Sequence, residues 1–178
     1  MRVLIEMGHP AHVHQFRHVI YELRKKGHEV TVATTDKDMT LALLNAYELE
    51  YTLLGVNKGG GVAYKSVVLL RSFLKMFTVA KSFDPDLFIS RGSLVSAITS
   101  KLLGKPHISF YDTEHTSIQN AITVPLTDAI ITPSCYQKDH GKSQIKVEGY
   151  KELMYLHPNY FTPNPAVLAE LGLAEGDP

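Results

Sequence analysis

The 178-residue sequence predicts an α/β protein built on a doubly wound parallel sheet. Short apolar runs alternate with segments of helical period from residue 3 to residue 147. Basic residues and a glycine close the first helical segment at 25–27, and Gly104 closes a later one. Strands separated by helices pair in parallel through right-handed crossovers, so this order of elements predicts helices on both faces of one sheet.

The individual elements follow from the same pattern. Short apolar runs are typical of strands buried on both faces, and they lie at 3–5, 29–33, 51–54, 87–89, 106–110, 129–131 and 145–147. Helices are expected at 13–23, after Asp36, at 64–83 and at 93–103. The side chain of Asp36 is expected to cap the second of these helices.

The composition excludes several classes of protein. The 18 Lys and Arg residues balance the 18 Asp and Glu residues, whereas proteins that bind nucleic acid through its phosphates usually carry a basic excess. Cys135 is the only cysteine, so no intrachain disulfide can form. The chain shows neither the apolar core of a signal peptide nor the roughly 18–20 apolar residues of a membrane-spanning helix. We therefore expect a cytoplasmic protein that does not bind nucleic acid.

The pattern divides the chain after Gly149. Residues 1–149 hold the alternating strands and helices and form the predicted domain. Residues 150–165 contain three prolines and four Tyr or Phe residues without a clear period, as in a linker or a segment strapped across a domain face. One more short helix is expected at 166–172. Residues 150–178 are interpreted as a linker and the start of a second domain that the chain lacks.

The loop at 8–14 follows the first predicted strand, at the sheet edge where open parallel sheets bind ligands. A glycine lets the backbone approach a ligand, the next helix offers free N–H groups, and histidines can act as a general base, which singles out Gly8, His9, His12 and His14. The alternative is a polar, exposed helix start. The loop lacks a Gly-x-Gly-x-x-Gly motif, so no dinucleotide site is expected. Although His14 and His18 have the spacing of metal ligands, no metal site is expected.

Two further loops lie after predicted strands at this edge. The first opens a helix and suits an anion or a hydroxyl group, through Arg91, Gly92 and Ser93. Its alternative role is a tight turn in which the serine caps the helix. The second is rich in groups that perform acid–base chemistry or bind sugar hydroxyls: Asp112, Glu114 and His115. Its alternative role is a helix start.

The segment 58–83 combines a nearly all-apolar helix with scattered Lys and Arg residues. Core packing explains such a helix most simply. A helix that a second domain covers, or one that makes a peripheral contact with a membrane, would show the same pattern. The glycines at 59–61 lack the Gly-Lys-Ser/Thr ending of a phosphate-binding loop.

Several short motifs together resemble one family. They are Gly-His-Pro-Ala-His-Val-His-Gln-Phe at 8–16, Lys-Gly-His-Glu-Val at 26–30, Phe-Asp-Pro-Asp-Leu at 83–87, Arg-Gly-Ser at 91–93, Leu-Gly-Lys-Pro at 103–106, Asp-Thr-Glu-His at 112–115 and Gly-Tyr-Lys-Glu-Leu-Met-Tyr-Leu-His-Pro at 149–158. The sequence thereby resembles, over essentially its whole length, a largely archaeal family of unknown function placed with GT-B glycosyltransferases and UDP-N-acetylglucosamine 2-epimerases.

The resemblance implies a Rossmann-like, acceptor-side N-terminal domain of a GT-B fold. The missing C-terminal domain would bind most of a nucleotide-sugar donor such as a UDP-sugar, and no cofactor is implied. His12 matches the histidine that acts as, or near, the catalytic base in many such transferases. Glu114 is the nearest match to a catalytic glutamate of the epimerases, about two residues out of register. The epimerases carry an aspartate where this sequence has Arg91-Gly92-Ser93, and that departure disfavours epimerase chemistry.

Two functional hypotheses follow. In the first, the chain is half of a glycosyltransferase-like enzyme, with a 2-epimerase as the alternative chemistry, and it has no turnover alone. In the second, it is a non-catalytic binding module that forms a homodimer through the helix at 64–83 and the aromatic segment at 150–161.

Overall fold

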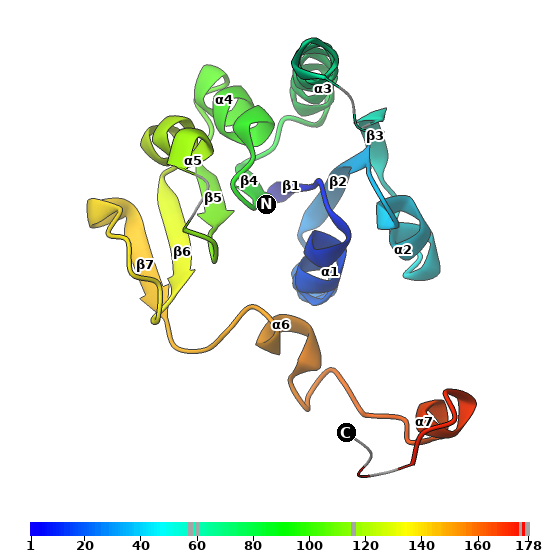
Figure 1. The fold of residues 1–178 in the computed structure, drawn as a ribbon. Helices are drawn as coiled ribbons and strands as arrows, with labels where there is room; N and C mark the ends of the chain where they lie inside the picture. The colour runs from blue at the N-terminus through cyan, green and yellow to red at the C-terminus, as the bar shows by residue number, and fades with distance from the viewer. Residues whose placement is uncertain (57–58, 60, 115–116, 175, 177–178) are drawn as a thin grey trace.

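The computed structural model describes residues 1–56, 59, 61–114, 117–174 and 176. Within them, seven parallel strands form one sheet in the order β3-β2-β1-β4-β5-β6-β7 (Figure 1). The strands are β1 Arg2–Met7, β2 Glu29–Asp36, β3 Thr52–Val56, β4 Leu87–Ser90, β5 His107–Phe110, β6 Ala129–Pro133 and β7 Gln144–Val147. This sheet confirms the predicted α/β class and all seven predicted strands.

Helices cover both faces of the sheet. One face carries α1 (Pro10–Lys25) and α2 (Thr40–Ala46), and the other carries α3 (Val62–Phe83), α4 (Leu94–Leu102) and α5 (Ser117–Thr123) (Figure 1). Short helical turns complete the chain at η1 Val124–Leu126, η2 Gly141–Ser143, α6 Leu153–Leu156 and α7 Ala166–Glu170. The change of face between α2 and α3 makes the sheet doubly wound.

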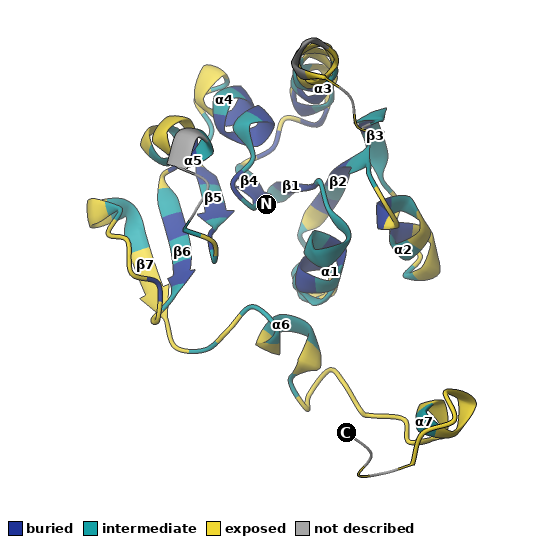
Figure 2. Ribbon diagram, in the orientation of Figure 1, coloured by how far each residue is buried: buried dark blue, intermediate teal, exposed yellow. Residues whose placement is uncertain are grey.

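Two apolar layers hold the helices on the sheet. Alternate residues of β1 point to opposite faces, because side chains of a strand alternate. Ile5 packs in the layer with Phe16 and Ile20 of α1, whereas Leu4 packs in the layer with Met76 of α3. Figure 2 shows the buried residues gathered on the central strands and on the helix faces turned toward them.

One predicted cap is wrong. Asp36 is the last residue of β2 and pairs with Val56 of β3, so it belongs to the sheet. The helix α2 begins four residues later, after Met39, without a side-chain cap. Strand pairing therefore outweighs the local capping preference at Asp36.

The segment after β7 lies across α1. Met154 packs against the apolar layer on that face. Tyr155 approaches His14 with 5.7 Å between ring centroids, and Tyr160 stacks on His18 at 4.6 Å. The chain then leaves this face as the exposed α7 (Figure 2). From the sequence, residues 150–165 are interpreted as a linker or as a segment strapped across a domain face. As far as Tyr160, the contacts are those of a strapped segment.

None of the helices in the described part of the chain combines the length and the apolarity needed to cross a bilayer.

Candidate functional site

The loops that the sequence predicts as candidate sites lie at the carboxyl edge of the sheet. A pocket opens there between β1 and β4. The chain leaves β1 toward α1 on one face and leaves β4 toward α4 on the other, so the two loops separate and open a crevice. A cavity of about 380 Å³ occupies this crevice and extends to α3. We call it the switch-point pocket, and its polar lining includes Glu6, His12, Thr35, Lys65, Ser72, Arg91, Ser93 and Gln119.

The loop at 8–14, which carries the histidines, supplies one wall of the pocket. His9 is the N-cap of α1, and its Nδ1 accepts a hydrogen bond from the backbone N–H of Ala11 at 3.2 Å. His12 Nδ1 accepts from the backbone N–H of Gly8 at 3.3 Å. Burial, together with the positive charge of Arg91, lowers the pKa of His12 to about 3. The ring is therefore neutral near pH 7 and carries its proton on Nε2.

A carboxylate at the end of β1 completes this wall. Glu6 is 7% exposed and accepts hydrogen bonds from the hydroxyls of Ser93, at 2.5 Å, and Ser96. Burial raises the pKa of the Glu6 carboxyl, against the two serine hydrogen bonds, which favour its ionised form. A buried carboxyl with a raised pKa, in the wall of a cavity, is a candidate for proton transfer.

The turn after β4 holds the backbone close to this cavity. Gly92 has a positive φ of 61°, and a Cβ there would lie 3.4 Å from both Gln119 and Tyr111. Its N–H donates to Ser109 Oγ at 2.8 Å. Ser93 then caps α4 by accepting from the N–H of Ser96 at 3.2 Å. The structure thus shows the tight turn with its capping serine, and Ser93 also lines the pocket, while binding of an anion or a hydroxyl group by this turn stays a prediction.

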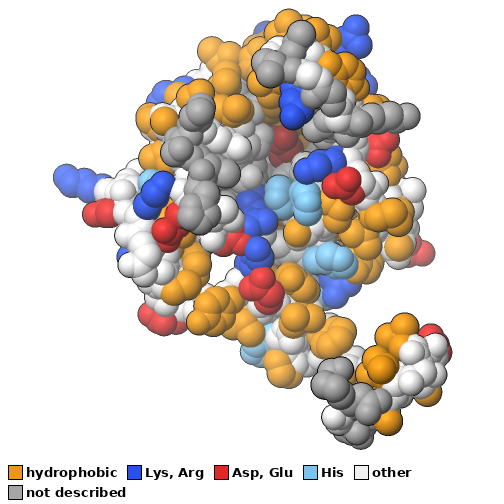
Figure 3. Space-filling model, in the orientation of Figure 1, with side chains coloured by type: hydrophobic (Ala, Val, Ile, Leu, Met, Phe, Trp, Pro, Cys, Tyr) orange, Lys and Arg blue, Asp and Glu red, His pale blue; other side chains and the backbone are white. Residues whose placement is uncertain are grey.

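Arg91 belongs to an ion cluster that joins three segments. We call Arg91, Asp112 and Lys151 the charge clamp: both cations pair with the aspartate, Arg91 on Oδ1 and Lys151 on Oδ2. Burial alone would raise the pKa of Asp112, but the hydrogen bond from Lys151 and the charge of Arg91 outweigh burial and lower it. Asp112 is held ionised and is a poor proton acceptor. Figure 3 shows Lys and Arg side chains (blue) beside histidine side chains (pale blue) near the middle of this face.

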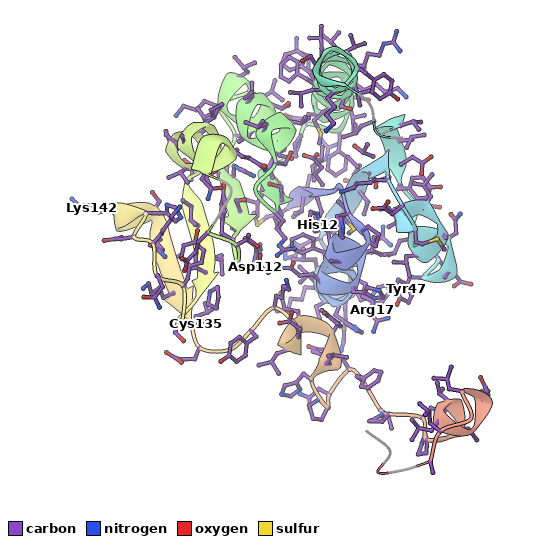
Figure 4. The ribbon with its side chains drawn as sticks, viewed as in Figure 1. His12, Arg17, Tyr47, Asp112, Cys135 and Lys142 are labelled. Carbon is purple, nitrogen blue, oxygen red and sulfur yellow. The ribbon has the colours of Figure 1, made fainter. Side chains whose placement is uncertain are left out.

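A second cavity of about 160 Å³ adjoins the first and shares His12, Arg91 and Gln119 with it. Gly92 and Asp112 also line it. Figure 4 shows His12 and Asp112 over the carboxyl ends of the central strands. The structure thus brings the loops at 8–12, 91–93 and 112 together around one crevice.

Other predicted site residues lie elsewhere. His14 faces α2, where its Nδ1 is 3.0 Å from the Tyr47 hydroxyl. Glu114 turns toward the loop after β6 and accepts from the backbone N–H of Gln137 at 2.6 Å. His115 falls outside the described residues. In the part of the chain that the structure describes, no group of three His, Cys, Asp or Glu side chains could hold a metal ion.

Sequence reasoning missed Glu6, Gln119 and Lys151 as site residues. One signal was available for Glu6, because it interrupts the apolar run of a strand expected to be buried on both faces. Lys151 stands in a quoted motif, but its partner Asp112 is 39 residues away in the sequence.

Comparison with solved structures identifies the fold. A UDP-N-acetylglucosamine 2-epimerase superposes with a TM-score of 0.68 at 13% identity, over 97% of this chain and 55% of that one. The spinosyn forosaminyltransferase SpnP superposes with a TM-score of 0.64 at 17% identity, over 83% of this chain and 50% of that one. The chain has the Rossmann-like α/β fold of one half of such GT-B proteins.

The chain itself belongs to the family described as Protein of unknown function (DUF354), which matches residues 1–177. It is 24% identical over 184 residues to the uncharacterized protein MJ0665 of Methanocaldococcus jannaschii. That alignment covers 99% of this chain and 54% of the relative, so the chain spans about half the relative's length.

Proposed function

We propose that this chain is the acceptor-side domain of a nucleotide-sugar enzyme that transfers a glycosyl group to a hydroxyl acceptor. The observation that carries the proposal is the switch-point pocket, where a buried carboxyl, a neutral imidazole and a guanidinium meet at the carboxyl edge of a GT-B-like sheet. Glycosyl transfer needs a group that takes the acceptor proton and groups that stabilise the departing diphosphate.

Glu6 is better suited than His12 to take the proton from the acceptor hydroxyl. General bases work best when their pKa lies near the operating pH. Burial moves the pKa of Glu6 upward, toward neutrality, whereas the pKa of His12 lies at about 3 and makes it a weak base. Because His12 Nδ1 is occupied by the N–H of Gly8, its Nε2–H is left to orient the acceptor hydroxyl. We therefore assign proton transfer to Glu6 and positioning to His12.

Arg91 is the group that best suits the anionic end of the donor. Its guanidinium lines both adjoining cavities, and the clamp with Asp112 fixes its position. We propose that a UDP-sugar binds mainly to a second domain and presents its diphosphate to Arg91 across the crevice. The remaining substrate contacts are assigned to Gly8, His9, Gly92, Ser93 and Asp112.

Epimerisation of a UDP-sugar is the second candidate, and Glu6 favours it. The turn at 91–93 lacks the aspartate of the 2-epimerases, but the structure holds the Glu6 carboxyl 2.5 Å from Ser93 Oγ. A carboxyl from β1 thus lies where the sequence of the turn itself offers none. An epimerase would use such a group to remove a proton from carbon rather than from oxygen.

A reaction in deuterium oxide separates the two candidates. A longer protein that contains this chain and the second domain of its relatives is incubated with UDP-N-acetylglucosamine and followed by proton NMR. Transfer leaves the C2 proton of the sugar in place, whereas epimerisation exchanges it for deuterium. Neither UDP release nor exchange, with a panel of UDP-sugars, would contradict the proposal. The 178-residue chain alone is expected to have no turnover.

A further inference from the structure

We propose that the outer face of α3 binds an anionic lipid surface, and that the acceptor is therefore a membrane-borne amphiphile whose polar head enters the switch-point pocket. The part about the acceptor rests on the proposed function, whereas lipid binding stands on the surface of α3 itself.

Packing in the core accounts for only one face of α3. Met76 and Ala80 are buried against the sheet. On the outer side, Val67, Leu70 and Leu74 are 49%, 59% and 56% exposed and lie at helical spacing, so they form an apolar stripe along the helix. Tyr64 and Leu69 are exposed beside this stripe. Exposed apolar stripes of this kind mark interaction surfaces.

The charge around the stripe identifies its partner. Residues 51–83 contain five Lys and Arg residues and no Asp or Glu, although the whole chain has 18 of each sign. On α3 itself Lys65, Arg71, Lys75 and Lys81 are exposed. An apolar stripe among basic residues suits the acyl boundary and the anionic headgroups of a bilayer, because the apolar side chains insert and the basic side chains pair with the headgroups. Docking thus needs no membrane-spanning helix.

The same surface is continuous with the switch-point pocket. A groove of about 810 Å³ runs between α3 and the edge strand β3, with Val67 and Leu74 in its wall. Val68 lines both this groove and the switch-point pocket, and Lys65 and Leu69 line the pocket as well. An amphiphile can therefore lay its apolar chain in the groove while its head reaches Glu6 and His12.

A second copy of this chain suits the surface less well. A twofold contact between two α3 helices would place the same basic patch on both sides, with no Asp or Glu in residues 51–83 to offset it. Like charges facing each other destabilise such an interface. The lipid headgroup supplies the missing negative charge.

Sedimentation with vesicles tests the proposal on the 178-residue chain. The wild type is mixed with vesicles of phosphatidylcholine alone or with one-quarter phosphatidylglycerol, at 0.1 M and 0.5 M salt. We expect binding to the anionic vesicles only, weakened by the higher salt. No binding, or equal binding to both compositions, overturns the proposal.

Two double variants locate the surface. Leu70→Glu with Leu74→Glu, and Arg71→Glu with Lys81→Glu, should each lower the partition coefficient at least tenfold. The matched control, Leu102→Glu with Lys142→Glu, changes an exposed leucine and an exposed lysine on other elements and should stay within twofold. Circular dichroism verifies that all of them fold. Double variants on α3 that bind like the wild type refute the assignment to α3. Since sedimentation needs no donor and no turnover, its failure leaves the proposed reaction standing.

Discussion

At the scale of single residues, His107 stabilises the turn at 91–93 through a buried hydrogen-bond network. Its Nε2 lies 2.9 Å from Ser90 Oγ, and its Nδ1 lies 3.1 Å from Thr127 Oγ1. Ser90 Oγ also accepts the N–H of Ser93, so the buried imidazole lies one hydrogen bond away from the turn that shapes the pocket. Burial lowers the pKa of His107 to about 4.

This shift predicts that acid weakens the fold. Between pH 6.5, the ordinary value for histidine, and pH 4, the unfolded chain binds a proton at His107 that the folded chain does not. The free energy of unfolding therefore falls as pH drops through this window, by roughly 3 kcal/mol from this group. Urea titrations at several pH values should show His107→Gln with a flatter dependence than the wild type. The lowered pKa of His12 contributes equally to both proteins. An equal pH dependence of the free energy of unfolding in both would therefore contradict the role of His107.

Glu6 contributes a pH dependence of the free energy of unfolding opposite in sign to that of His107. Because its folded pKa is raised, the free energy of unfolding falls as pH rises from the ordinary glutamate value of 4.5 to the folded pKa of Glu6. Glu6→Gln removes the carboxylate charge and keeps an acceptor oxygen for Ser93 and Ser96, so its melting temperature at pH 8 should equal or exceed that of the wild type. Glu6→Ala, which leaves both hydroxyls without their acceptor, should be destabilised by about 1–3 kcal/mol. A clear drop in the melting temperature of Glu6→Gln would show that the carboxylate is needed for folding.

At the scale of elements, the charge clamp ties the segment after β7 to the sheet. Lys151 is the first side chain of that segment to pair with the body of the domain through Asp112. Asp112→Asn removes the negative charge that both cations share. Amide hydrogen exchange should then speed up in residues 150–161, while the central strands stay protected.

Glu152→Gln is the matched control for the clamp. The Glu152 carboxylate is 3.8 Å from the same lysine and its side chain is 46% exposed, so this ion pair is weak and its loss should leave the exchange unchanged. Unchanged exchange in Asp112→Asn would show that the contacts of Met154, Tyr155 and Tyr160 hold the segment by themselves.

The elements also show which features a sequence can predict. The strands were predictable because a parallel strand buried on both faces must be a continuous apolar run, as 87–89 is. The helix α5 was predicted only as the alternative role of the loop before it, since this helix is short and partly polar and packs against α4. Glu6 was not predicted as a site residue, because its serine partners lie about 90 residues away. The charge clamp depends on contacts of the same kind, which no local pattern reveals.

At the scale of the whole molecule, the doubly wound sheet explains why the site is where it is. The helices change face between α2 and α3, so the loops after β1 and β4 part and leave the crevice that holds Glu6, His12 and Arg91. The strapped segment 150–161 lies on the face of α1, whereas the proposed lipid surface lies on α3, across the sheet (Figure 1). We propose that the crevice receives the nucleotide-sugar and its acceptor and that the outer face of α3 contacts the membrane.

The rate of UDP release from a UDP-sugar tests the central claim, that Glu6 performs the acid–base step in the switch-point pocket. It is measured across pH in the longer protein described above, with Glu6→Gln and with the exposed Glu50→Gln as control. The account predicts that Glu6→Gln lowers kcat by about 100-fold or more while Glu50→Gln stays within twofold. It also predicts that the wild-type rate rises with pH through a pKa above that of an ordinary glutamate. A Glu6→Gln protein with the wild-type rate and pH profile would contradict the account.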